Sequence, residues 1–189
     1  MDGRLRIRDM TFADCRRVSE IRVSGWRTAY RGLIPRSYLD ALDVDAETER
    51  RRARLAEGDG RVVNVVAVGA PPGPSRHWGK DGETVVGWAA HGPYREGEVR
   101  TGDAELYALY VAPDLLGRGI GRALLTEAVH RCSAAGHPRM YLWALKDNVR
   151  ARRFYERAGF HADGTEAAFG ADGVTVPEVR YAAVLPLLG

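Results

Sequence analysis

Residues 111–125, VAPDLLGRGIGRALL, decide the fold: a strand runs into a glycine-rich turn and directly on into a helix. Pro113 ends the strand because it cannot donate a hydrogen bond to the ladder. Gly117, Gly119 and Gly121 permit backbone angles and a close approach that a Cβ would block. The unpaired N–H groups of the first helical turn then point at one spot, where the helix dipole adds about half a positive charge. The sequence therefore predicts a pyrophosphate site at this turn.

Arg118 and Arg122 flank the glycines and can reinforce a phosphate site from the side. A tight turn without a ligand is the alternative. A Rossmann site fits less well, because the spacing is GxGxG rather than GxGxxG. In addition, the region about 20 residues after Gly121, near Tyr141, has no carboxylate for a ribose, and Asp147 comes too late. The Walker pattern fails because no Gly-Lys-Ser/Thr follows.

Alternating and β-branched runs predict strands, and periodic runs predict helices between them. The expected strands are Arg4–Arg8, Val62–Val68, Thr84–His91, Glu105–Val111, Arg139–Ala144 and Glu178–Leu185. Five helices are expected. They are one from an N-cap at Thr11 to about Ser24, a short one after Pro35, and three over 46–57, Gly119–Ala135 and Val149–Ala158. Turn-forming residues predict an aromatic loop at 26–35, a mobile hairpin loop at 70–83 and a turn-rich stretch at Gly92–Gly102. This order predicts an α/β fold, an α+β mixed sheet with one strand–helix–strand unit at its centre.

Length and composition predict one domain over residues 1–189, because 45% hydrophobic and 28% charged residues are typical of a globular chain of this size. Cys15 and Cys132 lie far apart in helix-like stretches, so we expect packing residues rather than a zinc site or a disulfide. The five histidines have no ligand spacing, and no metal site is expected.

The net charge of +3 is mild, and the Arg50–Arg54 run lacks interleaved aromatic residues. We therefore expect a solvated helix face there and no nucleic-acid partner. The N-terminus lacks the apolar core of a signal peptide, and no apolar run is long enough to span a bilayer. No membrane partner and a cytoplasmic location are expected.

A second motif lies at residues 146–160, KDNVRARRFYERAGF. Together with Glu105–Leu125 it resembles the two central motifs of the GCN5-related N-acetyltransferase (GNAT) superfamily. The family pattern Asn-x-x-Ala-x-x-x-Tyr-x-x-x-Gly-Phe is matched from Asn148 to Phe160. The family turn Gln/Arg-x-x-Gly-x-Gly/Ala is matched at 116–121, except that Leu116 stands at its first position. The resemblance covers residues 84–162 well and the first 60 residues more loosely.

The resemblance implies the acyl-CoA N-acyltransferase (GNAT) fold, a central, mostly antiparallel sheet flanked by helices. In that fold the strand at Glu105–Val111 is bulged and splays from the strand at Arg139–Ala144. It also implies acetyl-CoA as cosubstrate, with the pyrophosphate bound mostly by backbone amides. The implied contacts are Leu116, Gly117, Arg118, Gly119, Ile120, Gly121 and Arg122 for the pyrophosphate, Leu109, Tyr110 and Val111 for pantetheine, Asn148 for either part, and Tyr155 for the sulfur.

The resemblance assigns the catalytic chemistry to Tyr155 and Glu105. Tyr155 would donate a proton to the departing thiolate, which suits a phenol of pKa about 10 and a thiol of about 8.5. The alternative is a core tyrosine beside Phe154. Glu105 matches the general base of histone-type members, and its carboxylate could take the proton that an ammonium must lose, directly or through water. The alternative is a solvent-facing or salt-bridged strand-end residue. In the strand Glu105–Val111, odd positions are expected on one face and even positions on the other.

Trp26 and Tyr30 belong to a Trp-x-x-Ala-Tyr-x-Gly-x-x-Pro segment that resembles the acceptor wall of bacterial family members. Aromatic faces beside Glu105 would suit a cationic amine. A core role is the equal alternative for Trp26 and Tyr30, and Tyr107 and Tyr110 are likewise ambiguous.

We therefore expect an N-acetyltransferase that moves an acetyl group from acetyl-CoA to a primary amine by direct attack in a ternary complex. The amine is a small molecule or a peptide or protein amine; polyamine, aminoglycoside, amino acid and protein N-terminus all stay open. One rival is a non-catalytic acyl-CoA-binding module on the same fold, and the other is a dinucleotide-dependent oxidoreductase. A homodimer is expected only from the family, whose members are often dimers.

Overall fold

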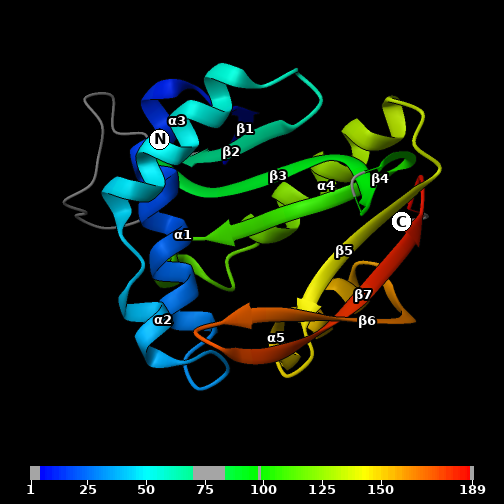
Figure 1. Ribbon diagram of the computed structural model, residues 1–189. Helices are drawn as coiled ribbons and strands as arrows, with labels where there is room; N and C mark the ends of the chain where they lie inside the picture. Colours follow the sequence, from blue (N-terminus) through cyan, green and yellow to red (C-terminus); the bar gives the residue numbers. More distant parts are fainter. Residues whose placement is uncertain (1–4, 70–83, 98, 188–189) are drawn as a thin grey trace.

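The computed structural model describes residues 5–69, 84–97 and 99–187, and the loop expected at 70–83 lies outside these ranges. A seven-stranded sheet of order β1-β2-β3-β4-β5-β7-β6 runs through the molecule with helices packed against it (Figure 1). The strands are β1 (Arg6–Asp9), β2 (Val63–Gly69), β3 (Thr84–Glu96), β4 (Val99–Val111), β5 (Arg139–Leu145), β6 (His161–Ala171) and β7 (Val174–Val184). The α-helices are α1 (Cys15–Ala29), α2 (Arg36–Asp40), α3 (Val44–Glu57), α4 (Ile120–Ala134) and α5 (Val149–Arg157), and the short 3₁₀ turns are η1 (Phe12–Asp14) and η2 (Pro113–Leu115).

Every strand pair of the sheet is antiparallel except β4–β5, which is parallel. The β4–β5 ladder is short: Ala104 pairs with Met140, and the pairing ends where Leu106 meets Leu142. Beyond that point β4 continues to Val111 and β5 to Leu145 without pairing with each other. The expected mixed sheet with two splayed central strands is confirmed.

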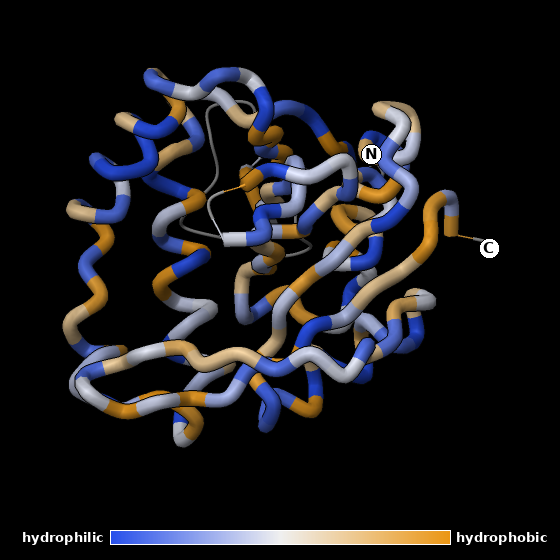
Figure 2. The backbone as a smooth tube through the Cα atoms, turned by 45° about the vertical axis from the view of Figure 1, so that its right-hand side comes forward, coloured by the Kyte–Doolittle hydropathy of each residue, from blue (hydrophilic) through white to orange (hydrophobic). Residues whose placement is uncertain are grey.

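Helices α1 and α4 pack against opposite faces of the sheet. Successive residues of β4 show this, because side chains along a strand point to alternate faces. Tyr110 of β4 lies against Gly25 of α1, whereas its neighbours Leu109 and Val111 lie against Gly121 of α4. In Figure 1, α4 passes behind β3 and β4. Hydrophilic and hydrophobic residues alternate along the helices, as helices with one buried side require (Figure 2). Within the described ranges, no helix combines the length and apolarity needed to cross a membrane.

The predicted capping pattern at Thr11 forms, but it caps the short turn η1, which leads into α1 at Cys15. The Asp14 carboxylate accepts hydrogen bonds from the backbone N–H of Thr11 at 2.7 Å and from its hydroxyl at 2.8 Å. The helix continues to Ala29, however, so the prediction of a loop beginning at Trp26 is wrong. The reason is packing, since Trp26 is buried and its carbonyl accepts the N–H of Tyr30 in a last helical turn.

The prediction of a turn-rich stretch at Gly92–Gly102 is also wrong. β3 runs on to Glu96 and β4 begins at Val99, so the two strands form a long hairpin. Pro93 lies inside β3, next to a register shift between Pro93 and Arg95. An irregular ladder tolerates the missing proline N–H. Residues that are typical of turns can therefore lie within a strand here.

Two further differences concern the end of the chain and the arginine run. Strand β6 was not expected; it is rich in alanine and glycine, mostly exposed, and lies at the edge of the described sheet, paired with β7. β7 begins at Val174, earlier than predicted. In α3, Arg51 is buried rather than solvated, because it pairs with Glu47 at 3.0 Å and its guanidinium lies over the Trp88 ring. Cys15 and Cys132 are buried free thiols, as expected of packing residues.

Candidate active site

A β-bulge at Tyr107 shapes the centre of β4. Ala90 of β3 pairs with Ala108, but the next residue, His91, pairs with Leu106, which leaves Tyr107 as the extra residue. The Tyr107 hydroxyl donates a hydrogen bond to the carbonyl of Pro93, which holds the bulge to β3. The predicted bulge is confirmed.

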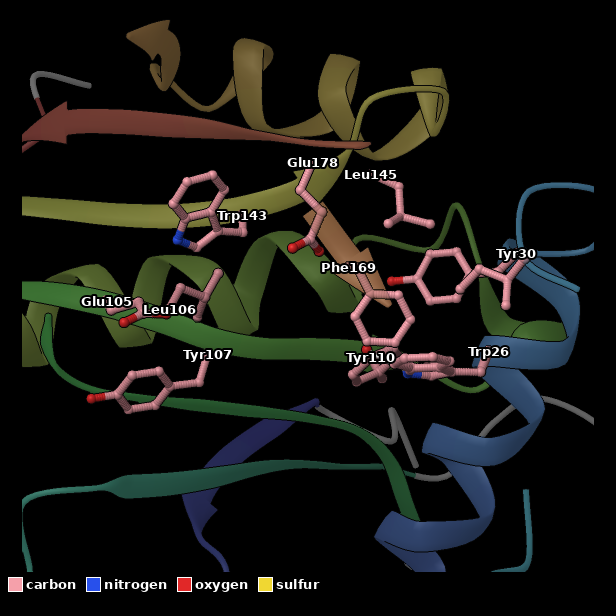
Figure 3. A pocket seen from close by; sticks show the side chains of 11 residues that line it. Trp26, Tyr30, Glu105, Leu106, Tyr107, Tyr110, Trp143, Leu145, Phe169 and Glu178 are labelled. Atoms are coloured by element: carbon pink, nitrogen blue, oxygen red, sulfur yellow. Dashed lines mark hydrogen bonds between the residues drawn. The ribbon is translucent and has the colours of Figure 1, made fainter. Parts of the chain in front are cut away.

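The bulge also overturns the simple odd–even alternation expected along this strand. Glu105 and Tyr110 differ by an odd number of positions and yet line the same pocket, because one extra residue separates them. This pocket has a volume of about 160 Å³ and opens where β4 and β5 diverge (Figure 3). Its lining comes from α1, the segment before α2, and strands β4 to β7: Trp26, Tyr30, Ile34, Glu105, Leu106, Tyr107, Tyr110, Trp143, Leu145, Phe169 and Glu178.

Trp26 organises the aromatic side of the pocket. Its ring meets Tyr30 edge to face at a centroid distance of 4.9 Å and Phe169 at 5.7 Å. Its indole N–H donates a 2.7 Å hydrogen bond to the hydroxyl of Tyr110. Burial raises the pKa of both Tyr30 and Tyr110, so these phenols are neutral at physiological pH. Trp26 and Tyr30 therefore pack in a small core and also line the pocket.

Glu105 is a buried carboxylate with one weak partner. Only 8% of the residue is exposed. The backbone N–H of Arg95 donates to Oε2 at 3.4 Å, and the guanidinium of the same residue, itself exposed, lies 3.8 Å away over the Tyr107 ring. Burial raises the pKa of the Glu105 carboxyl, although the charge of Arg95 acts in the opposite direction. A carboxylate with a raised pKa is better suited to accept a proton.

Tyr155 does not line this pocket. It lies on α5, where its ring packs against Phe154 at 5.1 Å and Phe160 at 6.2 Å. Burial raises its pKa and so does the nearby Tyr110 phenol, which means that Tyr155 stays protonated at neutral pH. Phe154 lies next to Gly121, so this part of α5 is on the α4 side of β4. Tyr155 is thus close to Tyr110 of the pocket without being part of the pocket lining.

The glycine turn forms the start of α4 on that same side. Gly117 and Gly119 both have φ +82°, in the left-handed region, and Gly119 is the N-cap of the helix. Arg118 and Arg122 are exposed and have no ion-pair or hydrogen-bond partner within the described part of the chain. Free first-turn N–H groups with two unpaired guanidiniums beside them can bind a pyrophosphate. Leu116, the residue that departs from the family pattern, is 38% exposed.

Asn148 is the N-cap of α5. Its side-chain oxygen accepts the backbone N–H of Ala151 at 3.2 Å, which leaves the amide NH₂ group as its remaining donor. The position expected to contact the cosubstrate therefore also has a local structural role.

Two pocket residues that the sequence analysis does not name as site residues are Glu178 and Trp143, which the fold brings into the lining. Glu178 lies on β7 opposite Leu145 of β5. Burial raises the pKa of its carboxyl, and no hydrogen-bond or ion-pair partner exists for that carboxyl among the described residues. A carboxylate inside a mostly apolar strand-like run is the one signal that points to Glu178.

Three comparisons place the chain among known proteins. The family model "Acetyltransferase (GNAT) family" matches residues 26–160. "Probable N-acetyltransferase Rv2775" of Mycobacterium tuberculosis is 28% identical over 94% of this chain and 92% of its own, and "Uncharacterized N-acetyltransferase YuaI" of Bacillus subtilis is 28% identical over 75% and 72%. The solved structure of yncA from Salmonella typhimurium with its cofactor acetyl-CoA has a TM-score of 0.67 over 99% of this chain and 97% of that one. At 20% identity, that likeness concerns the fold.

Proposed function

The chain belongs to the Acetyltransferase (GNAT) family, and from that premise we propose that it acetylates a primary amine with acetyl-CoA by direct attack in a ternary complex. The observation that carries this proposal is the gap between β4 and β5. It has the Glu105 pocket on the α1 side and the glycine turn on the α4 side, and Tyr155 lies close to Tyr110 of the pocket. An acceptor and a thioester can approach one strand from two faces there.

Glu105 is proposed as the general base. A primary amine reaches the pocket mostly as its ammonium ion and cannot attack until it has lost a proton. The raised pKa of the buried Glu105 carboxyl supports this role, as does its position at the bulge, among the aromatic rings of the pocket. The neutral amine then attacks the thioester carbon.

Tyr155 is proposed as the general acid. As the bond between the acyl carbon and sulfur breaks, Tyr155 gives its phenolic proton to the departing sulfur, and the proton released by the new amide nitrogen replaces it through solvent. A phenol whose pKa is raised by burial is protonated and available at neutral pH. Amide groups of β4 that lack a partner on β5 beyond Leu106, around Leu109 to Val111, are proposed to bind pantetheine as an added strand.

The turn at residues 116–122 fits the pyrophosphate of the cosubstrate. A Cβ added at Gly117 or Gly119 meets no atom within 4 Å, so the space over the turn is open to a ligand. Backbone N–H groups from the first turn of α4, together with Arg118 and Arg122, would bind it, and Leu116 adds no polar group. Asn148 is proposed to contribute its free amide N–H.

Calorimetric titration with acetyl-CoA, coenzyme A and NAD tests the proposal first. We expect micromolar binding of acetyl-CoA and none of NAD, followed by thiol release when an amine is added. Binding without thiol release from any amine would favour the non-catalytic module, and preferential binding of NAD would favour the oxidoreductase. The single domain over 1–189 is likewise proposed, on the strength of one continuous sheet. A homodimer stays an expectation from the family resemblance, and a cytoplasmic location stays a prediction from the sequence.

A further inference from the structure

Two carboxylates reach the same pocket from two strands. Glu105 comes from β4 and Glu178 from β7, and Figure 3 shows the Glu178 carboxylate directed into the space between Trp143 and Phe169. Glu105 already has Arg95 nearby, whereas Glu178 has no hydrogen-bond or ion-pair partner among the described residues; its charge adds to the burial that raises the pKa of the Tyr30 phenol. A half-buried carboxylate without a partner is costly unless a ligand compensates it.

The two carboxylates do not form a pair that shares one proton. Glu105 is level with Tyr141 of β5, whereas Glu178 is opposite Leu145. These β5 positions are four residues apart, which corresponds to about 13 Å along the strand. The carboxylates therefore approach the pocket from separate ends, with aromatic rings between them.

The rest of the lining selects against anionic acceptors. Among the described residues that line the pocket there is no lysine, arginine or histidine, and the Arg95 guanidinium beside it already lies 3.8 Å from Glu105, so a carboxylate on the acceptor would find no free cation there. The Trp26 ring already has the Arg22 guanidinium over it at 4.8 Å and the Trp143 ring has that of Arg180 at 5.9 Å, so both rings attract cations in this protein, and Phe169 adds a further aromatic face. The volume of about 160 Å³ is below the 300–1,000 Å³ usual for drug-sized ligands, which favours a thin, flexible acceptor over a bulky ring system.

We propose that the acceptor is a short linear diamine whose reacting amino group lies at Glu105 and whose second ammonium group is bound by Glu178. This inference rests on the proposed acetyl transfer and names its substrate class. Glu178 is a binding residue in this scheme, and Glu105 remains the base.

Three primary amines that share a four-carbon chain and differ only in the group at its other end test this proposal directly. The panel is 1,4-diaminobutane, 1-aminobutane and 4-aminobutanoate, assayed by thiol release from acetyl-CoA with the wild-type protein, Glu178→Gln and the matched control Glu166→Gln. Glu166 lies on the neighbouring strand β6, exposed and paired with Lys146, away from the pocket. Binding of 1,4-diaminobutane in the presence of coenzyme A is measured separately by calorimetry.

We expect the wild type to prefer the diamine over 1-aminobutane by about tenfold or more in kcat/KM and to use 4-aminobutanoate least. Glu178→Gln should raise KM and Kd for the diamine about tenfold, with kcat and the use of 1-aminobutane unchanged, and Glu166→Gln should behave as wild type. Unimpaired acetyl-CoA binding by each variant shows that it is folded.

Equal use of the diamine and 1-aminobutane, or good use of 4-aminobutanoate, overturns the diamine inference but keeps acetyl transfer. A fall in kcat with both amines in Glu178→Gln, with a changed pH profile, also overturns it and makes Glu178 the base. Diamine binding that depends on Glu178, without thiol release from any acceptor, supports the binding site and refutes the proposed activity.

Discussion

Replacing Gly119 by alanine tests whether the turn at the start of α4 depends on a left-handed residue. Gly119 has φ +82°, a conformation that costs a residue with a Cβ about 1–2 kcal/mol. A Cβ added there meets no atom within 4 Å, so a steric clash contributes nothing and the whole effect comes from the backbone. We expect Gly119→Ala to lower the free energy of unfolding by about 1–2 kcal/mol, or the melting temperature by about 2–8 °C.

Two matched variants isolate the cause. Gly119→Asn should recover part of the loss, because asparagine tolerates the left-handed region better than alanine. Gly121→Ala, two residues on, should be at least as stable as wild type: Gly121 lies within the helix, and its added Cβ would make ordinary contacts of 3.6 Å with Leu109, Val111 and Phe154.

The assays are thermal unfolding and calorimetric titration with acetyl-CoA. If the turn binds the pyrophosphate, the strain in Gly119→Ala should also raise the dissociation constant, by up to about tenfold for 1.4 kcal/mol. Gly121→Ala should bind within about threefold of wild type. Equal stability and equal affinity for Gly119→Ala and Gly121→Ala would refute the reasoning.

Three further predictions concern single side chains. Tyr155→Phe should lower kcat about 100-fold while the acetyl-CoA dissociation constant stays within about twofold; unchanged turnover removes Tyr155 as the acid. Because burial raises the pKa of Glu105, the acidic limb of the kcat/KM profile should lie above the pH of about 4.3 usual for a glutamate, and Glu105→Gln should abolish that limb. A profile unaltered by this variant would place the base elsewhere. Burial lowers the pKa of His91 to about 4, so its neutral form contributes stability above pH about 6.5 that is lost as the pH falls toward 4, up to about 3 kcal/mol. Denaturant unfolding at pH 7 and pH 4 should therefore show a smaller pH effect in His91→Leu than in wild type, and an equal effect would contradict the assignment.

Local rules account for the elements that were predicted correctly. Pro113, the glycine turn and Gly136 delimit α4 by restrictions on single residues, and the β-branched run of β2 needs no distant partner to be recognised. The same rules misread Gly92–Gly102 and missed β6. In both cases the segment is a strand because another strand pairs with it. The residues close to it in the sequence do not reveal that pairing.

The sequence by itself determined the strand–turn–helix unit, the second motif at Asn148–Phe160 and hence the family, because backbone sterics and helix capping act over a few residues. Only the tertiary structure decided which side chains share the pocket. The bulge at Tyr107 turns Glu105 to the side of Tyr110, and the register of β7 on β5 brings in Glu178. Both depend on strand register, where a shift of one residue moves a side chain to the other face of the sheet. That register is set by the packing of the whole sheet.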